Sequence, residues 1–517
     1  MHEEDPARCV PVWPISRGAD LEERLAAWIG EAAAAFAKAS GFVGEEGQVL
    51  PIPNGLVEAS SSSSSSSSHQ PGIAGWLFGM GDGSSPFILG VLPSKLPGDA
   101  TYAIPEDAAR DLSKEHLLGW GLGSYAFRRY KDQGSTAAAA ASSPSPSSPS
   151  TSSASPPPTN GSPKPPAAPP QLHIPNATDL ADLDMLTRSI FIGRDLINTP
   201  CCDLGPADLA AACERVGRAN GARVRIIADD RELARDFPLV HAVGRAAADG
   251  RGPRVVDMSW TPPEDAGSSQ GGSGALPRVT LVGKGVCFDT GGLDIKPPSN
   301  MMTMKKDMGG AAAVLSLASM IMEARINVQL RVLVPAVENC VAGNAFRPSD
   351  VITSRSGLTV EIGNTDAEGR LILADCLSLA SEDTPDVLLD MATLTGAHRV
   401  ALGWDLPGIF TDSDAMASEL YAEGIEHNDP VWRLPLWKPY DKLIDSKLAD
   451  VNNIGSVNWG GAITAALFLQ RFVTGCGSWV HIDFNGWTRE KPGLPEGGEP
   501  QAVRAVFEVL RERYGTA

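Results

Sequence analysis

The chain has 517 residues, of which 62 are Asp or Glu and 43 are Lys or Arg, so its formal net charge at pH 7 is −19. This acidic balance argues against nucleic acid as a partner, because binding there depends largely on cationic side chains that neutralise phosphates. The eight cysteines include no CxxC pair, so neither a zinc ribbon nor a secreted disulfide framework is indicated.

The first residues, MHEEDPARCVPVW, are acidic where a secretory or transit peptide needs basic residues. No stretch approaches the roughly 20 apolar residues that span a bilayer. We therefore expect a cytoplasmic protein that does not associate with membranes.

Residues 1–133 predict a small α/β domain. The segment 21–42 is rich in Ala and predicts a helix, 85–93 (SPFILGVLP) predicts a strand, and 106–131 predicts a second helical stretch. A run of serines at 60–68 interrupts this domain and predicts a loop insertion, because such residues bury too little apolar surface to fold.

A second low-complexity segment, 134–171, is rich in Ser, Pro and Ala and predicts a linker. After it, 172–517 predicts a larger catalytic domain that starts with a linking helix at 179–200. Near-continuous apolar strands then alternate with helices, which is typical of a mostly parallel sheet covered by helices. The predicted strands are 278–283, 327–337 and 386–394, and the predicted helices are 309–324 and 369–382.

Charged side chains gather where these strands are expected to end, which is where open α/β sheets place their sites. The stretch LVGKGVCFDTGGLDIK carries Lys284, Asp289 and Lys296, and Asp307 lies just before a helix. Taken alone, the lysines could form a simple ion pair, and Asp307 could be an acid of the first helical turn, favoured by the helix dipole.

The third stretch, NTDAEGRL, sets Asp366, Glu368 and Arg370 at alternate positions, which predicts one face of an extended segment. Alone it could be a surface acid pair with an arginine partner. Together, the four carboxylates of the three stretches would repel one another strongly unless cations held them. Hard oxygen ligands suit divalent ions, so the sequence predicts a two-metal site.

These three stretches, in this order, resemble the leucine (cytosol) aminopeptidase family of two-metal enzymes, whose signature is NTDAEGRL. Further stretches that match are RDLINTP, MATLTGAHRVALG, ADVNNIG and WVHIDFNG. The resemblance covers the chain from about Arg188 onward. It implies a metal-dependent aminopeptidase that removes N-terminal residues from short peptides.

The resemblance also implies roles for single residues. The metal ligands would be Lys284, Asp289, Asp307, Asp366 and Glu368. Asp289 and Glu368 would bridge two Zn²⁺ or Mn²⁺ ions, with Co²⁺ or Mg²⁺ as alternatives, and Lys284 would bind as a neutral amine. Lys296 would stabilise the oxyanion, and Arg370 would hold a bicarbonate that shuttles protons, for which a planar guanidinium is suited. The structural alternative for Lys296 is a solvated loop lysine, and that for Arg370 is a salt bridge to Asp366 or Glu368.

The residues implied to bind substrate are Met304, Asn364, Thr393, Leu394, Gly396 and Ala462. Met304 and Ala462 make the pocket apolar and favour Leu or Met at the N-terminus of the substrate, although Met304 could also be core filler. The family assembles as a homo-hexamer, a dimer of trimers, so the same assembly is implied here.

Two other functions use the same sequence features. A cysteinyl-glycine dipeptidase would have the same site, and a paralogue could be catalytically silent and serve as a structural or DNA-accessory protein. Asp294 stands where many members have a small hydroxyl residue, and alternation places it on the side of Lys296, where an inward-facing carboxylate would pair with that lysine and tune it as an oxyanion donor. His398 and His481 have no second histidine at ligand spacing, so we expect structural roles for both.

Overall fold

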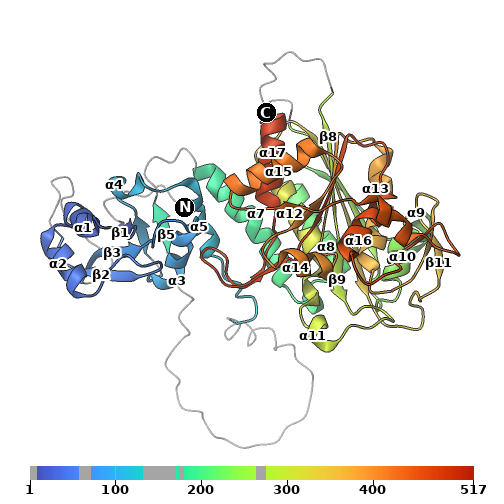
Figure 1. The fold of residues 1–517 in the computed structure, drawn as a ribbon, viewed down its shortest axis with the longest axis horizontal. Helices are drawn as coiled ribbons and strands as arrows, with labels where there is room; N and C mark the ends of the chain where they lie inside the picture. The colour runs from blue at the N-terminus through green and yellow to red at the C-terminus, as the bar shows by residue number, and fades with distance from the viewer. Residues whose placement is uncertain are drawn as a thin grey trace, which may run out of the picture. The chain divides into compact units, whose positions relative to one another are not determined.

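The computed structural model describes residues 9–57, 72–98, 100–131, 170–173, 180–263 and 275–516. The chain forms two compact units, Met1–Thr178 and Asp179–Ala517, which are coloured from blue to red along the chain in Figure 1. The serine run at 60–68 and the part of the low-complexity segment at 134–169 lie outside the described residues.

The first unit is built on a five-stranded sheet with the order β2-β3-β1-β4-β5. Its strands are β1 Val10–Ile15, β2 Val49–Pro53, β3 Ile73–Gly79, β4 Thr101–Ala103 and β5 Gln171–His173. Strand β5 pairs in parallel with β4. Residues 171–173 therefore belong to the sheet of the first unit, whereas we expected a linker up to 171 and the second domain from 172.

The helices of the first unit are shorter than predicted. They are α1 Leu21–Ile29, α2 Glu31–Ala39, α3 Leu92–Lys95, α4 Glu106–Ala109 and α5 Lys114–Gly123. Gly30, with φ of 84°, separates α1 from α2, because a left-handed residue ends a helix. The expected second helical stretch is likewise divided, since Ser113 caps a new helix by accepting a hydrogen bond from the amide of His116.

The strand prediction for 85–93 is wrong. This segment forms the 3₁₀ helix η2 Ile88–Val91, which continues into α3. Short apolar runs do not distinguish strands from buried helical turns. Here α5 packs directly on the segment: a Cβ at Gly123 would lie 2.0 Å from the carbonyl oxygen of Gly90. This close approach buries Ile88 and Leu89 on a helical turn.

The second unit contains a nine-stranded sheet with the order β15-β14-β17-β13-β8-β10-β7-β6, and β9 pairs with β10 beside this path. Strands β17, β13, β8 and β10 are parallel neighbours, so the prediction of a mostly parallel sheet is confirmed. The strands are β6 Arg223–Ile227, β7 Arg254–Trp260, β8 Arg278–Gly283, β9 Gly285–Asp289, β10 Gln329–Asn339, β13 Val387–Ala392, β14 Gly408–Phe410, β15 Trp432–Arg433 and β17 Ser478–Asp483. A small three-stranded sheet contains β11 Val351–Thr353, β12 Thr359–Glu361 and β16 Val451–Asn452. A two-stranded sheet contains β18 Trp487–Thr488 and β19 Gly497–Gly498.

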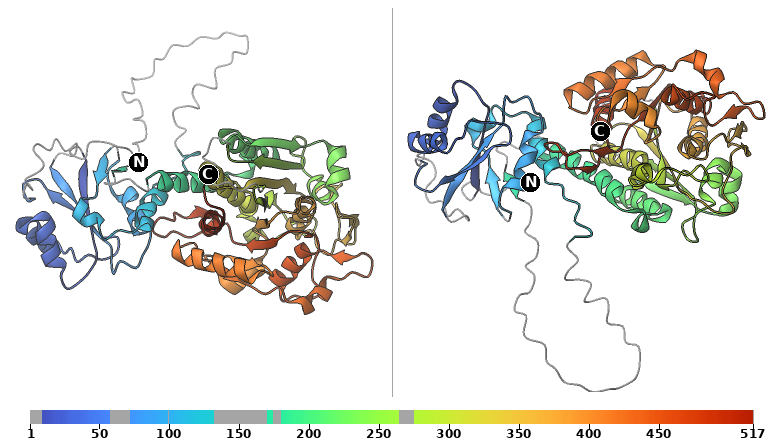
Figure 2. Two further views of the ribbon diagram at one scale, coloured as in Figure 1. Left: turned by 90° about the horizontal axis from the view of Figure 1, so that it is seen from above. Right: turned by 60° about the horizontal axis from the view of Figure 1, so that its bottom comes forward.

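Helices cover both faces of this sheet, as Figures 1 and 2 show. Helix α12 packs with α7 and α17, whereas α13 packs with α10 and α16. The helices are α7 Leu180–Asn198, α8 Pro206–Ala219, α9 Asp230–Asp236, α10 Pro238–Gly244, α11 Pro298–Met301, α12 Gly309–Glu323, α13 Glu368–Glu382, α14 Gly396–Leu402, α15 Asp414–Glu426, α16 Gly461–Gln470 and α17 Val503–Tyr514. The 3₁₀ helices are η3 Cys201–Asp203, η4 Met304–Met308 and η5 Lys438–Ile444. In the described part of the chain, no helix is both long and apolar enough to cross a bilayer.

The chain passes from β8 to β9 at Lys284, and this crossing positions the site. Strand β10 pairs with β8 through Leu333 and with β9 from Ala336 onward. Both residues beside Lys284 must be glycine. A Cβ at Gly283 would lie 2.7 Å from the Cα of Ala311, and one at Gly285 would lie 2.4 Å from the carbonyl oxygen of Pro335.

Candidate metal centre

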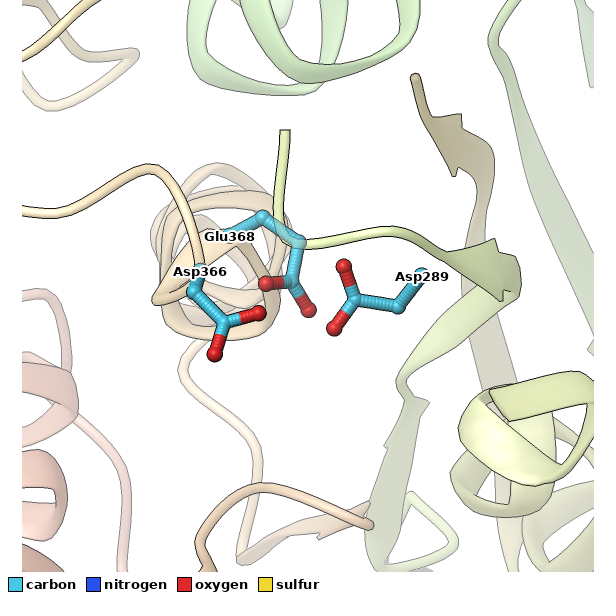
Figure 3. Close-up of side chains that lie close together, drawn as sticks. All are labelled: Asp289, Asp366 and Glu368. Carbon is cyan, nitrogen blue, oxygen red and sulfur yellow. The ribbon is translucent and has the colours of Figure 1, made fainter. Parts of the chain in front are cut away.

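Carboxylates from three separate segments meet at the carboxyl edge of the sheet. Asp289 ends β9, Asp366 lies in the turn before α13, and Glu368 is the first residue of that helix. One oxygen of each lies within 4.8 Å of the others, and Figure 3 shows the three side chains pointing toward one another. Asp307, in η4, is the fourth predicted carboxylate and is also buried.

Two lysines neutralise these carboxylates in the structure. The Nζ atom of Lys284 lies 2.8 Å from Asp307 Oδ2 and 3.0 Å from Glu368 Oε1, and donates a hydrogen bond to the carbonyl oxygen of Thr393. The Nζ atom of Lys296 lies 2.7 Å from Asp289 Oδ2 and also contacts Asp366. All five predicted ligands and the second active-site lysine thus form one connected cluster.

Burial and charge shift the pKa values in this cluster. Burial raises the pKa of Asp289, Asp307, Asp366 and Glu368, and repulsion between the carboxylates adds to this shift. Burial lowers the pKa of Lys284, but the charges of Asp307 and Glu368 outweigh it, so this pKa lies above its ordinary value. Without a metal ion, Lys284 is therefore an ammonium group and not the neutral amine expected of a ligand.

The donor set fits a divalent cation. Glu368 Oε2 is buried and has no hydrogen-bond partner among the described residues. A buried carboxylate oxygen in that position is stabilised by a cation. Hard carboxylate oxygens at this spacing suit Mg²⁺, Mn²⁺ or Zn²⁺, so the structure is consistent with the predicted class of site.

The predicted extended conformation of NTDAEGRL is wrong, because Glu368 and Arg370 lie in the first turn of α13. Residues two apart on a helix do not share a face. Glu368 accordingly reaches the carboxylate cluster, whereas Nη1 of Arg370 donates to the carbonyl oxygen of Asn453 at 2.7 Å. The salt bridge from Arg370 to Asp366 or Glu368 is not formed. Burial lowers the pKa of Arg370 to about 10.

Asp294 does not pair with Lys296 as expected. Its Oδ2 accepts a hydrogen bond from the amide of Thr365 at 2.8 Å, and its own amide donates to the Thr365 hydroxyl at 2.8 Å. The side chain faces the signature turn, so alternation along the loop was a poor guide to its direction.

Each of the two histidines has its own aspartate partner. His398 Nδ1 lies 3.1 Å from Asp483 Oδ1, and His481 Nδ1 lies 2.6 Å from Asp390 Oδ1. Both are structural contacts within the second unit.

Two of the predicted substrate-binding residues, Thr393 and Asn364, contact predicted metal ligands directly. Thr393 Oγ1 donates to Asp307 Oδ1 at 2.9 Å, and Asn364 Oδ1 accepts from the amide of Asp366 at 2.7 Å. Met304 begins η4, which also carries Asp307. The amide of Leu394 donates to Asp483, Gly396 begins α14, and Ala462 packs with Phe410 near the start of α16.

The sequence did not point to three polar residues that contact the predicted site residues or the turn beside them. Asn339 donates to Asp289 Oδ1 at 2.9 Å, Thr365 is buried beside Asp294, and the backbone of Asn453 receives Arg370. Asn339 could have been found, because it is the first uncharged polar residue after the apolar run of β10 and lies at the strand end where sites form. Thr365 gave no comparable signal.

Comparison with known proteins gives consistent matches over both units. The family model described as the cytosol aminopeptidase family, catalytic domain, matches residues 191–507, and the M17 aminopeptidase N-terminal domain matches residues 10–142. A probable cytosol aminopeptidase of Sinorhizobium medicae is 38% identical over 77% of this chain and 75% of its own length. For relatives from Chlorobium phaeobacteroides and Stenotrophomonas maltophilia, at 41% and 44% identity, the match spans 62% and 63% of their lengths.

Solved structures extend the similarity over nearly the whole chain. The cytosol aminopeptidase of Coxiella burnetii has a TM-score of 0.82 and 37% identity, covering 99% of this chain and 98% of its own. The bottromycin maturation enzyme BotP in complex with Mn has a TM-score of 0.77 and 26% identity, covering 98% of this chain and 100% of its own.

Proposed function

This chain belongs to the cytosol aminopeptidase family, and from this premise we propose that it is a metal-dependent aminopeptidase that releases N-terminal amino acids from short peptides. The observation that carries the proposal is the cluster of Asp289, Asp366 and Glu368, whose oxygens lie within 4.8 Å of one another. The silent structural or DNA-accessory alternative is not favoured, because every expected ligand position holds a competent residue.

We assign the metal ligands to Lys284, Asp289, Asp307, Asp366 and Glu368, which would together hold two divalent cations. Mn²⁺ and Zn²⁺ are our first choices, followed by Co²⁺ and Mg²⁺. The manganese in the BotP structure supports the first. When bound, such a pair of ions supplies a water of lowered pKa and a Lewis acid for the peptide carbonyl.

The chain's own charged residues would complete the reaction. Lys296 keeps its ammonium charge, since neighbouring carboxylates raise its pKa in spite of burial, so it can stabilise the oxyanion that develops on the substrate. Arg370 has a buried Nε with no hydrogen-bond partner among the described residues. This donor supports a bicarbonate held at Arg370, which would supply a proton-accepting group beside the metal ligands.

The substrate's side chain would enter a pocket formed by Met304, Asn364, Thr393, Leu394, Gly396 and Ala462. Its apolar members favour Leu or Met at the substrate N-terminus. We further propose a cytoplasmic homo-hexamer arranged as a dimer of trimers, in agreement with the family resemblance.

The test is hydrolysis of a leucyl anilide by metal-stripped, full-length protein after Mn²⁺, Co²⁺, Zn²⁺ or Mg²⁺ is added back. We expect activity to return with at least one ion and to be lost in an Asp366→Ala, Glu368→Ala double variant. A Glu106→Ala, Asp107→Ala double variant removes the same charge from exposed positions of α4 and should remain active. If folded protein hydrolysed no leucyl anilide with any of the ions, the proposal would be rejected. Turnover of Cys-Gly, compared with that of the leucyl anilide, tests the alternative of a cysteinyl-glycine dipeptidase.

A further inference from the structure

Thr365 is fully buried, and all of its polar groups are bonded. Its amide donates to Asp294 Oδ2 at 2.8 Å, and its hydroxyl donates to the carbonyl oxygen of Gly291 at 2.6 Å. The same hydroxyl accepts from the amide of Asp294 at 2.8 Å. The side-chain amide of Asn339 donates to the carbonyl oxygen of Thr365 at 3.1 Å. One threonine thus joins the turn before α13, the loop after β9 and the end of β10.

Asn339 extends this connection to the carboxylates. Its Nδ2 donates both to the carbonyl oxygen of Thr365 and, at 2.9 Å, to Asp289 Oδ1. Its backbone oxygen accepts from the amide and the hydroxyl of Thr290. The packing leaves no spare room, because a Cβ at Gly292 would lie 2.9 Å from both Asn339 Oδ1 and Thr365 Oγ1.

The loop after β9 is closed by a hydrogen bond from the amide of Lys296 to the carbonyl oxygen of Thr290. It therefore presents Lys296 at a fixed point beside Asp289. Thr365 immediately precedes Asp366, so the position of Thr365 fixes the backbone from which the Asp366 side chain extends. These bonds add to two other links between the segments, which are the pairing of β9 with β10 and the contacts of Lys296 with Asp289 and Asp366.

We propose that Asn339, Thr365 and Asp294, here called the Thr365 network, are positioning residues that hold Asp289 and Asp366 at the spacing needed to share cations. This inference rests on the metal site in the proposed function and adds the residues that fix the distance between two of its ligands. Groups that hold metal ligands by hydrogen bonds commonly change metal affinity about 10- to 100-fold when replaced. Asp294 contributes as an acceptor for Thr365, so its role depends on an oxygen and not on its charge.

The test measures binding of Mn²⁺ alone to metal-stripped, full-length protein by isothermal titration calorimetry, with electron paramagnetic resonance to report whether bound Mn²⁺ ions interact. Thr365→Val removes the hydroxyl with little change of shape, and we expect affinity to fall about 10- to 100-fold and the signal of interacting ions to weaken. Thr365→Ser keeps the hydroxyl and should restore both. Thr199→Val is the matched control, since Thr199 is buried and its hydroxyl donates to the carbonyl oxygen of Asp195.

A second pair of variants covers the case in which Thr365→Val fails to fold. Asp294→Asn retains a side-chain oxygen and should bind Mn²⁺ nearly as well as the unsubstituted protein, whereas Asp294→Ala should bind it at least about tenfold more weakly. Equal Mn²⁺ affinity in Asp294→Ala and Asp294→Asn would overturn the inference. So would equal losses in Thr365→Val and Thr199→Val. Failure of the unsubstituted protein to bind any of Mn²⁺, Zn²⁺, Co²⁺ and Mg²⁺ would overturn the proposed function as well, so the two failures are distinguishable.

Discussion

Lys296 lies between two carboxylates that hold its Nζ atom at the edge of the predicted reaction site. Lys296→Met removes the charge and keeps most of the side chain's volume. We expect kcat for a leucyl anilide to fall about 100- to 1,000-fold, the usual effect of losing one oxyanion donor. Steady-state kinetics of the Mn²⁺-loaded protein would measure this.

The control for Lys296→Met is Lys438→Met, because Lys438 is an exposed lysine that bonds to Gln470. Its kcat should be unchanged. If Lys296→Met retained full kcat, Lys296 would have only the loop-anchoring role that is its structural alternative.

The His398 and Asp483 pair predicts a dependence of stability on pH. Burial lowers the pKa of His398, but the charge of Asp483 and its hydrogen bond outweigh this, so the folded pKa lies above the unfolded value of about 6.5. The stabilisation is therefore complete below about pH 6.5 and is lost as pH rises through the folded pKa.

The measurement for this pair is urea unfolding of the unsubstituted protein and of His398→Gln between pH 6 and pH 9. The difference in unfolding free energy should shrink as pH rises. A difference that stays constant over the series would show that His398 contributes as a neutral hydrogen-bonding group.

The cysteines should differ strongly in reactivity, although none of the eight forms a disulfide in the described structure. Burial and the nearby Glu338 carboxylate raise the pKa of Cys201 to about 12 and that of Cys340 to about 11. Thiolates react with alkylating agents far faster than thiols. We therefore expect iodoacetamide at pH 7.5 to modify the exposed Cys202 before Cys201 and Cys340, which fragment-ion mass spectrometry can resolve. Faster labelling of Cys201 would contradict the burial that this structure gives it.

At the scale of single residues, the gathering of the five proposed ligands in one cluster was predictable, because their residue types are rare together and their order is specific. The direction of a side chain was not. Alternation along an extended chain predicted the side on which Asp294 and Arg370 lie, whereas a turn and a helix decide their contacts.

Helix α12 is held against the sheet by a glycine near its start. A Cβ at Gly310 would lie 2.1 Å from the carbonyl oxygen of Met391 and 2.8 Å from the amide of Lys284, both backbone atoms that cannot turn aside. Gly310→Ala should therefore lower the free energy of unfolding by at least about 1–3 kcal/mol. Chemical denaturation provides the measurement.

Gly343→Ala is the matched control, since a Cβ there meets nothing within 4 Å. Its effect should stay within about 0.5 kcal/mol. Similar stability of Gly310→Ala and Gly343→Ala would mean that α12 can shift away from β13 at little cost.

At the scale of elements, long apolar segments were predicted well and short ones were not. The linking helix α7, the strands β8, β10 and β13, and the helices α12 and α13 all lie near their predicted bounds. Their length and burial on both sides leave few alternatives. In the first unit, glycines at 30 and 123 decide where helices break or pack, and such close contacts are visible only once the fold is known.

At the scale of the whole molecule, each unit has its own hydrophobic core. One core contains Ile15, Leu77 and Tyr102, and another contains Leu333, Leu373 and Phe468. All proposed metal ligands lie in the second unit. Mn²⁺ at about 100 times its Kd should stabilise that unit by about 2.7 kcal/mol and leave the first unit unaffected.

Differential scanning calorimetry of the full chain with and without Mn²⁺ tests this. We expect two unfolding transitions, of which only one moves to higher temperature with the ion. A single transition, shifted as a whole, would show that the units unfold cooperatively.

The crossing from β8 to β9 bears on how relatives of this chain diverge. Packing requires Gly283 and Gly285, since a Cβ at either would overlap neighbouring atoms, whereas the lysine between them is required by the carboxylates of the site. Selection for folding and selection for activity therefore act on adjacent positions and can separate over evolutionary time. A descendant that gave up hydrolysis could replace the lysine but would have to keep both glycines. A glycine pair around a residue that is not lysine would then identify an inactive descendant that has retained the scaffold.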